Sequence, residues 1–116
     1  MKSKEASLQA GCVSWFYLQY PQYKGLLIAV PNGGSRRNAI EGYNLKRTGV
    51  VAGTADLLLL ISRKGYGCLC IEMKYGKGRQ SPSQKEWEAA TTKGGNLYTV
   101  CRSLDEFMNC INTYLT

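Results

Sequence analysis

Hydrophobic residues change their spacing along the chain, and these changes predict the order of its helices and strands. Over residues 3–20 they recur at mostly helical spacing until Pro21 ends the run, which predicts a first helix. Residues 26–30 form a short apolar run that a Pro-Asn-Gly-Gly turn stops, as expected for a strand. A second helix is expected over residues 36–48, where a glycine closes it. The first half of the chain thus predicts helix, strand and helix.

The second half opens with the most hydrophobic run of the sequence. Residues 56–61 predict a central strand, and the glycine-containing loop after them resembles a hairpin, so residues 68–74 should form its antiparallel neighbour. Capping boxes at Ser81 and Ser103 open the last two helices, and residues 97–101 between these helices predict a short strand. This order of elements predicts an α/β fold, in which a mixed central sheet is flanked by helices.

Apolar residues of the last helix and the cysteines are expected to lie in the core. The helix should pack through one stripe, made of Leu104, Phe107, Met108, Ile111 and Leu115. The 5 cysteines are an odd set without CxxC spacing, and the chain has no histidine. Reduced thiols are therefore expected, rather than disulfides or a zinc site.

Length and charge narrow the choice of function. At 116 residues and 12.9 kDa, the chain is expected to form one domain over residues 1–116. Its 15 Lys and Arg against 8 Asp and Glu give a net charge of +7, so the surface should attract polyanions, nucleic acid above all. No segment approaches the roughly 18 apolar residues of a spanning helix, and no signal peptide opens the chain. We expect a cytoplasmic protein that has no membrane partner.

Three charged residues interrupt the two apolar runs where the hairpin should bring them together. Asp56 begins the first run, while Glu72 and Lys74, two residues apart on a strand, project from one face. Carboxylates can hold Mg²⁺ while an ammonium group positions water or stabilises developing negative charge. The cluster therefore suits metal-assisted hydrolysis of a phosphodiester. The alternative is a strand-end cap at Asp56 and an ordinary ion pair of Glu72 at the sheet margin.

The order of these residues resembles the acid, then acid-x-lysine, signature of the PD-(D/E)xK nuclease superfamily, with Ala55 in place of the usual proline. A larger set of residues, covering nearly the whole chain, resembles the VRR-NUC family of that superfamily. The set comprises Asn32-Gly33-Gly34, Arg36, Leu45-Lys46, Gly49-Val50, Gly53-x-x-Asp56-Leu57, Glu72-x-Lys74 and Ser81-x-x-Gln84. A lone acid-x-lysine motif is weak, but this ordered combination is specific.

The resemblance implies a restriction-endonuclease-like fold and a Mg²⁺- or Mn²⁺-dependent nuclease that acts on DNA. Asp56, Glu72 and the carbonyl of Met73 would hold the metal, and Lys74 would act on the attacking water or on developing charge. The resemblance also implies a phage- or bacterial-type protein made of this domain alone, and a homodimer. Junction-resolving relatives make branched, Holliday-junction-like DNA a candidate substrate.

Two further residues are candidates for the site, each with a structural alternative. The resemblance favours an active-site role for Gln84, but its position three residues after Ser81 also suits a helix cap. Glu5 shares a helical face with Gln9 and could help to bind a metal-bound water, whereas its place in the first turn also suits the helix dipole.

Basic residues are expected to contact DNA phosphates, with solvated surface charge as the alternative for each one. They flank the second helix and follow the acidic strand: Arg36, Arg37, Lys46, Arg47, Lys77 and Arg79. The main alternative to a nuclease is a non-catalytic nucleic-acid-binding module on the same fold. A third possibility is an assembly protein held together by its aromatic helices, which would not bind DNA.

Overall fold

Within residues 4–31 and 46–116, which the computed structural model of the protein describes, four strands form a mixed sheet in the order β1-β2-β3-β4. The strands are β1 (Leu27–Ala29), β2 (Leu57–Leu59), β3 (Leu69–Met73) and β4 (Leu97–Cys101). β2 pairs antiparallel with both β1 and β3, whereas β3 and β4 are parallel. The strand predicted from the most hydrophobic run is therefore an inner strand, as expected.

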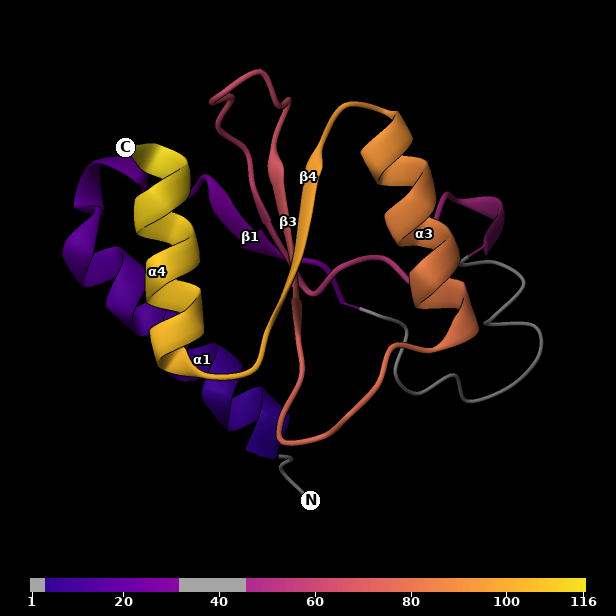
Figure 1. Ribbon diagram of the computed structural model, residues 1–116, viewed down its shortest axis with the longest axis horizontal. Coiled ribbons are helices and arrows are strands. Elements are labelled where there is room, and N and C mark those ends of the chain that lie inside the picture. The colour runs from indigo at the N-terminus through magenta and orange to yellow at the C-terminus, as the bar shows by residue number, and fades with distance from the viewer. Residues whose placement is uncertain (1–3, 32–45) are drawn as a thin grey trace.

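Helices cover both faces of this sheet (Figure 1). α1 (Lys4–Gln19) and α4 (Leu104–Leu115) lie together on one face, and α3 (Pro82–Lys93) lies on the other. A short 3-10 helix, η1 (Pro21–Tyr23), follows α1. Because β3 and β4 are parallel, α3 is the crossover helix between them. The mixed α/β fold predicted from the sequence is confirmed.

Alternate residues of β3 face different layers, as the pleat of a strand requires. One set belongs to the hydrophobic core between the sheet and the helices α1 and α4, with Phe16 and Phe107 from those helices. The core residues of β3 are Leu69, Ile71 and Met73. The intervening Cys70 is also buried and contacts Thr91 of α3, with 3.7 Å between sulfur and hydroxyl. Glu72 shares the α3 side with Cys70, which directs its carboxylate away from the core.

The buried stripe of α4 differs from the predicted one. Phe107, Ile111 and Tyr114 are buried, whereas Leu104 is 39% exposed. The stripe starts at Phe107 and continues to Tyr114, whose hydroxyl donates a hydrogen bond to the carbonyl of Ile61 at 2.6 Å. A tyrosine can occupy this position because its polar end has a buried partner.

The predicted and observed boundaries differ at the strand ends, and most of the predicted second helix cannot be compared. β2 spans three residues rather than residues 56–61, and the other strands also begin or end within one or two residues of expectation. Of the predicted second helix, residues 36–45 lie outside the described residues, as does the Asn-Gly-Gly turn, and only Lys46 and Arg47 are described as helical. In the described segments, no helix has the length and apolar character needed to cross a membrane.

Candidate active site

The β2–β3 hairpin brings the two predicted acids together. Leu57 pairs with Ile71, so one further step along the hairpin places Asp56 opposite Glu72. The carboxylate of Asp56 accepts a hydrogen bond from the backbone N–H of Met73 at 2.8 Å. This bond anchors Asp56 to the carboxyl end of β3.

Glu72 and Lys74 form an ion pair inside the protein. Nζ of Lys74 lies 3.3 Å from Oε2 of Glu72. Only 1% of Glu72 and 8% of Lys74 are exposed. Two charges lose most of their hydration at such depth, which makes the pair costly to maintain compared with the exposed ion pairs common at sheet margins. The burial of this pair therefore favours a functional interpretation.

Gln84 connects the ion pair to the start of α3. Its Oε1 accepts a hydrogen bond from Nζ of Lys74 at 3.0 Å, and its Nε2 donates to Oε2 of Glu72 at 3.0 Å. The same Oε1 accepts from the backbone N–H of Ser81 at 2.8 Å and completes the predicted capping box. The sequence offered helix capping and an active-site position as alternatives for Gln84. In the structure its side chain caps α3 and contacts the charged pair at the same time.

Gly53 allows the first turn of α3 to approach the chain that leads into Asp56. Its φ is +83°, and a Cβ at this position would lie 2.2 Å from the carbonyl oxygen of Ser83. No residue with a side chain fits there without displacing α3. Gly53 therefore positions Gln84 indirectly, which gives a physical reason for the glycine in the Gly53-x-x-Asp56 motif.

One carboxylate oxygen of Glu72 has no hydrogen-bond partner among the described residues. Oε2 receives both hydrogen-bonding contacts, from Lys74 and Gln84, whereas Oε1 is buried and has no hydrogen-bond partner in the described part of the chain. Burial, and secondly the negative charge of Asp56, raise the pKa of Glu72 to about 7, although Lys74 opposes this shift. A cation beside both carboxylates would offset the two causes that raise this pKa.

The oxygen donors at this place fit a magnesium or manganese ion. Asp56 and Glu72 supply carboxylates, and the carbonyl of Met73 projects to the same side of β3 as its N–H, which bonds to Asp56. Hard divalent cations prefer such oxygen donors. Across residues 4–31 and 46–116 no group of three or more His, Cys, Asp or Glu could hold a metal. Water and phosphate oxygens would have to complete the coordination shell.

Glu5 lies near this end of the molecule, but no contact ties it to the acids. It is in the first turn of α1, and the start of α1 lies at the end of the sheet where β3 finishes (Figure 1). Its neighbour Lys4 places Nζ 5.7 Å from the ring centre of Tyr75, the residue after Lys74. The Glu5 side chain makes no hydrogen bond or ion pair with another described residue, so its role in the site stays a prediction.

The structure describes four of the six predicted phosphate-binding residues. Lys77 and Arg79 are exposed in the loop between β3 and α3, next to the charged pair. Lys46 and Arg47 are exposed at the start of the second described segment, whereas Arg36 and Arg37 lie outside the described residues. The cations of the β3–α3 loop are therefore the ones that the structure places beside the site.

Arg102 is a further cation beside the β3–α3 loop, and it was not among the residues predicted from the sequence. It follows β4, and its Nη1 donates hydrogen bonds to the carbonyls of Gly76 and Gly78 in the β3–α3 loop, at 3.0 and 2.7 Å. Parallel pairing puts the carboxyl ends of β3 and β4 at the same end of the sheet. The strand-helix-strand order predicts such pairing, so it was the signal that could have identified Arg102.

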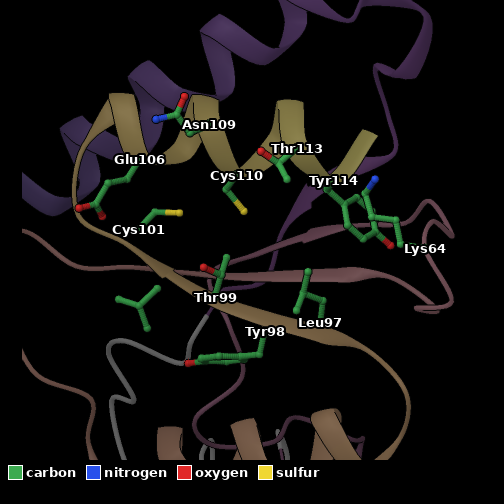
Figure 2. Close-up of a pocket in the computed structure, with 11 residues that line it drawn as sticks. Lys64, Leu97, Tyr98, Thr99, Cys101, Glu106, Asn109, Cys110, Thr113 and Tyr114 are labelled. Atoms are coloured by element: carbon green, nitrogen blue, oxygen red, sulfur yellow. The ribbon is translucent and has the colours of Figure 1, made fainter. Parts of the chain in front are cut away.

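A pocket of about 510 Å³ lies elsewhere, between β4 and α4 (Figure 2). Thr99 and Cys101 of β4 point toward α4, and Cys110 points back toward them, whereas Tyr98 projects to the opposite side of the strand. None of the acids or the lysine of the charged cluster lines this pocket. The cluster thus lies on the other side of the sheet, under the start of α3.

Comparisons with known proteins agree with this architecture. A solved structure described as a VRR_NUC domain protein matches the fold with a TM-score of 0.82 and 27% sequence identity, over 99% of this chain and 90% of that chain. No protein-family model and no curated protein matches the chain. The likeness covers every element that carries the charged cluster and indicates a nuclease-type domain.

Proposed function

Since the chain belongs to the VRR-NUC family, we propose that it is a metal-dependent endonuclease that hydrolyses phosphodiester bonds in DNA. Glu72 is the observation that carries this proposal. One of its oxygens is held by Lys74 and Gln84, while the other is buried without a partner among the described residues. A structural acid would be expected to satisfy both oxygens, because an unpaired buried polar atom is costly.

Mg²⁺ or Mn²⁺ is the proposed cofactor. Asp56, Glu72 and the carbonyl of Met73 would hold it, in agreement with the oxygen donors found at the carboxyl end of β3. When bound, such an ion polarises a phosphoryl oxygen and makes a bound water more acidic. The protein's part is to hold the two acids in place, which the Met73 N–H does for Asp56 and Gln84 does for Glu72.

Lys74 is the proposed stabiliser of negative charge on the phosphate. Hydrolysis forms a bond between a water oxygen and phosphorus and breaks the bond from phosphorus to the leaving oxygen, and charge builds on the phosphoryl oxygens between these events. An ammonium group held away from bulk water stabilises that charge strongly. Two of its three N–H donors face Glu72 and Gln84, which leaves one for a phosphate oxygen or the attacking water.

DNA is the proposed substrate because the site lies beside the cations of the β3–α3 loop and the whole chain carries a net charge of +7. Branched, Holliday-junction-like DNA is the proposed preferred form. Glu5 is proposed to bind a water at the metal, in keeping with the position of α1 at the same end of the sheet.

The decisive experiment is cleavage of single-stranded, duplex, flapped and four-way-junction DNA with Mg²⁺, Mn²⁺ or EDTA. Glu72→Gln keeps the size of the side chain but removes its negative charge, so we expect it to lower cleavage by on the order of a hundredfold or more. Glu86→Gln, which changes an exposed acid on α3, is the matched control and should cleave like the wild type. DNA binding without cleavage by any combination would favour the non-catalytic binding module instead.

A further inference from the structure

The chain makes a tight turn directly after Lys74, at residues 75–78. The N–H of Gly78 donates to the carbonyl of Tyr75 at 3.2 Å, and Gly76 has a φ of +62°, which glycine adopts without strain. A Cβ on Gly78 would lie 3.6 Å from Cδ of Lys74, so the turn lies against the site lysine. A nucleic acid strand bound at Lys74 would therefore lie close to this turn.

Arg102 holds the turn from the neighbouring strand. Its Nη1 bonds to the carbonyls of both Gly76 and Gly78, and its own backbone N–H donates to Oε1 of Glu106 at 2.7 Å. The guanidinium makes no ion pair with a described carboxylate. Arg102 therefore fixes the turn and also leaves its positive charge available to an anion.

Tyr75 presents an aromatic face at the start of this turn. Half of the residue is exposed, and Nζ of Lys4 lies 5.7 Å from the ring centre. Lys77 and Arg79, both exposed, follow within four residues. An exposed ring among several cations is the combination with which proteins bind unpaired nucleotides, because the ring stacks on a base while the cations contact phosphates.

We infer that the turn surface, formed by Tyr75, Lys77, Arg102 and Lys4, binds an unpaired nucleotide of the DNA strand beside the scissile phosphate. A base inside a duplex already stacks on its neighbours, so only a single-stranded or frayed position offers a free face to Tyr75. This inference rests on the proposed nuclease function and narrows the proposed branched substrate to DNA whose branch point exposes an unpaired nucleotide next to the cleavage point. Arg102 acts as a positioning residue that keeps the turn in its binding shape.

Binding of a single-stranded oligothymidine and of a blunt duplex of equal length, measured by fluorescence anisotropy in EDTA, tests the inference. We expect Tyr75→Ala to weaken single-strand binding about tenfold and to leave duplex binding nearly unchanged. Tyr75→Phe should retain the affinity, because it keeps the ring. Tyr17→Ala is the matched control, since Tyr17 is also an exposed tyrosine under a lysine, with Nζ of Lys24 5.3 Å from its ring.

Two further variants separate stacking from charge. Lys77→Ala should reduce the salt dependence of single-strand binding by about one released counterion, whereas Tyr75→Ala should leave that dependence unchanged. Arg102→Lys keeps the charge but loses the two-carbonyl contact, so it should weaken single-strand binding while the chain stays folded. Arg63→Lys is its control, because Arg63 also donates to a backbone carbonyl, that of Ser62 at 2.9 Å.

The outcomes distinguish this inference from the function on which it rests. Equal losses on single strand and duplex in Tyr75→Ala, or no loss on either, would overturn the stacking role even if the wild type cleaves DNA. A wild type that binds single strands through Tyr75 but cleaves no DNA would instead overturn the nuclease proposal and leave the binding surface standing. Cleavage of flapped and blunt DNA at saturating enzyme, run in parallel, provides this second readout.

Discussion

Gln84 serves two purposes through one amide group. Its Oε1 accepts from the backbone N–H of Ser81 and from Lys74, and its Nε2 donates to Glu72. Because Gln84 is fixed at the start of α3, its hydrogen bonds hold the side chains of Glu72 and Lys74 in place. Side chains that orient charged groups in this way commonly change activity more than stability when they are removed.

Paired variants separate these two purposes of Gln84. Both Gln84→Ala and Ser81→Ala disrupt the capping box, so each should lower the free energy of unfolding by about 1 kcal/mol. Only Gln84→Ala removes the contacts with Glu72 and Lys74, and we expect it to lower cleavage by about tenfold or more. Urea unfolding and initial cleavage rates provide the two measurements. Equal cleavage by both variants would show that Gln84 acts as a cap alone.

The start of α3 and the hairpin meet through a backbone contact that permits no side chain. Gly53 has a positive φ, and the carbonyl of Ser83 occupies the space where its Cβ would be. The position of α3 over β3 and β4, and hence the reach of its first turn to the site, depends on this contact. The glycine of the Gly53-x-x-Asp56 motif therefore serves the packing of α3 against the chain before β2, and has no chemical role of its own.

Gly53→Ala should show this dependence. Strain at positive φ and the clash with Ser83 together should destabilise the protein by about 3 kcal/mol. Gly49→Ala is the control, because Gly49 has a φ of +105° but nothing within 4 Å of the added Cβ, so strain alone should cost about 1 kcal/mol. Urea unfolding compares the two, and equal losses would show that the approach of α3 tolerates a methyl group.

Several sources of positive charge meet at one end of the described part of the molecule. The N-termini of α1, α3 and α4 lie at the end of the sheet where β3 and β4 finish (Figure 1). Helix N-termini carry partial positive charge, which adds to the cations of the β3–α3 loop and of Arg102. The buried acids therefore lie beneath a positively charged surface that favours the approach of a polyanion.

On the face of the sheet opposite α1 and α4, β1 and the residues around it carry exposed apolar side chains that suit contact with a second copy of the chain. Leu26, Ile28 and Leu60 are 38%, 39% and 47% exposed. The N–H of Leu60 bonds to the carbonyl of Leu26, and Ile28 pairs with Leu58, so these side chains share one face of the sheet. We therefore propose that the chain forms a homodimer, the state that the family resemblance implies, through this patch.

Light scattering on the purified protein tests that dimer. We expect a mass twice that of the 12.9 kDa chain, and Ile28→Asp should return it to the monomer because it places a charge in the apolar patch. Leu18→Asp is the control, since Leu18 is 84% exposed on α1 and outside the patch. A wild-type mass of one chain at all concentrations would contradict the dimer and leave the fold and site unaffected.

Local signals in the sequence predicted the parts of the structure that short-range interactions decide. The capping box at Ser81 does open α3, and the hairpin does place Asp56 beside Glu72. At α4 only half of the predicted box is present: the Ser103 hydroxyl accepts from the N–H of Glu106, whereas the Glu106 carboxylate accepts from the backbone N–H of Arg102 rather than that of Ser103. Each of these features depends on residues less than about twenty positions apart, where periodicity and turn chemistry act directly. The family resemblance drawn from these motifs agrees with the observed fold.

Contacts between distant elements were decided only by the tertiary structure. The depth at which Glu72 is buried and the close approach of Gly53 to Ser83 both depend on how α3 docks on the sheet. The same docking leaves one Glu72 oxygen without a hydrogen-bond partner in the described part of the chain. Arg102 meets the 75–78 turn only because β4 lies parallel to β3. The sequence by itself determined which residues carry charge and where helices and strands begin, because those preferences are local. Burial and packing between layers selected the partners of each charge, because they are properties of the assembled fold.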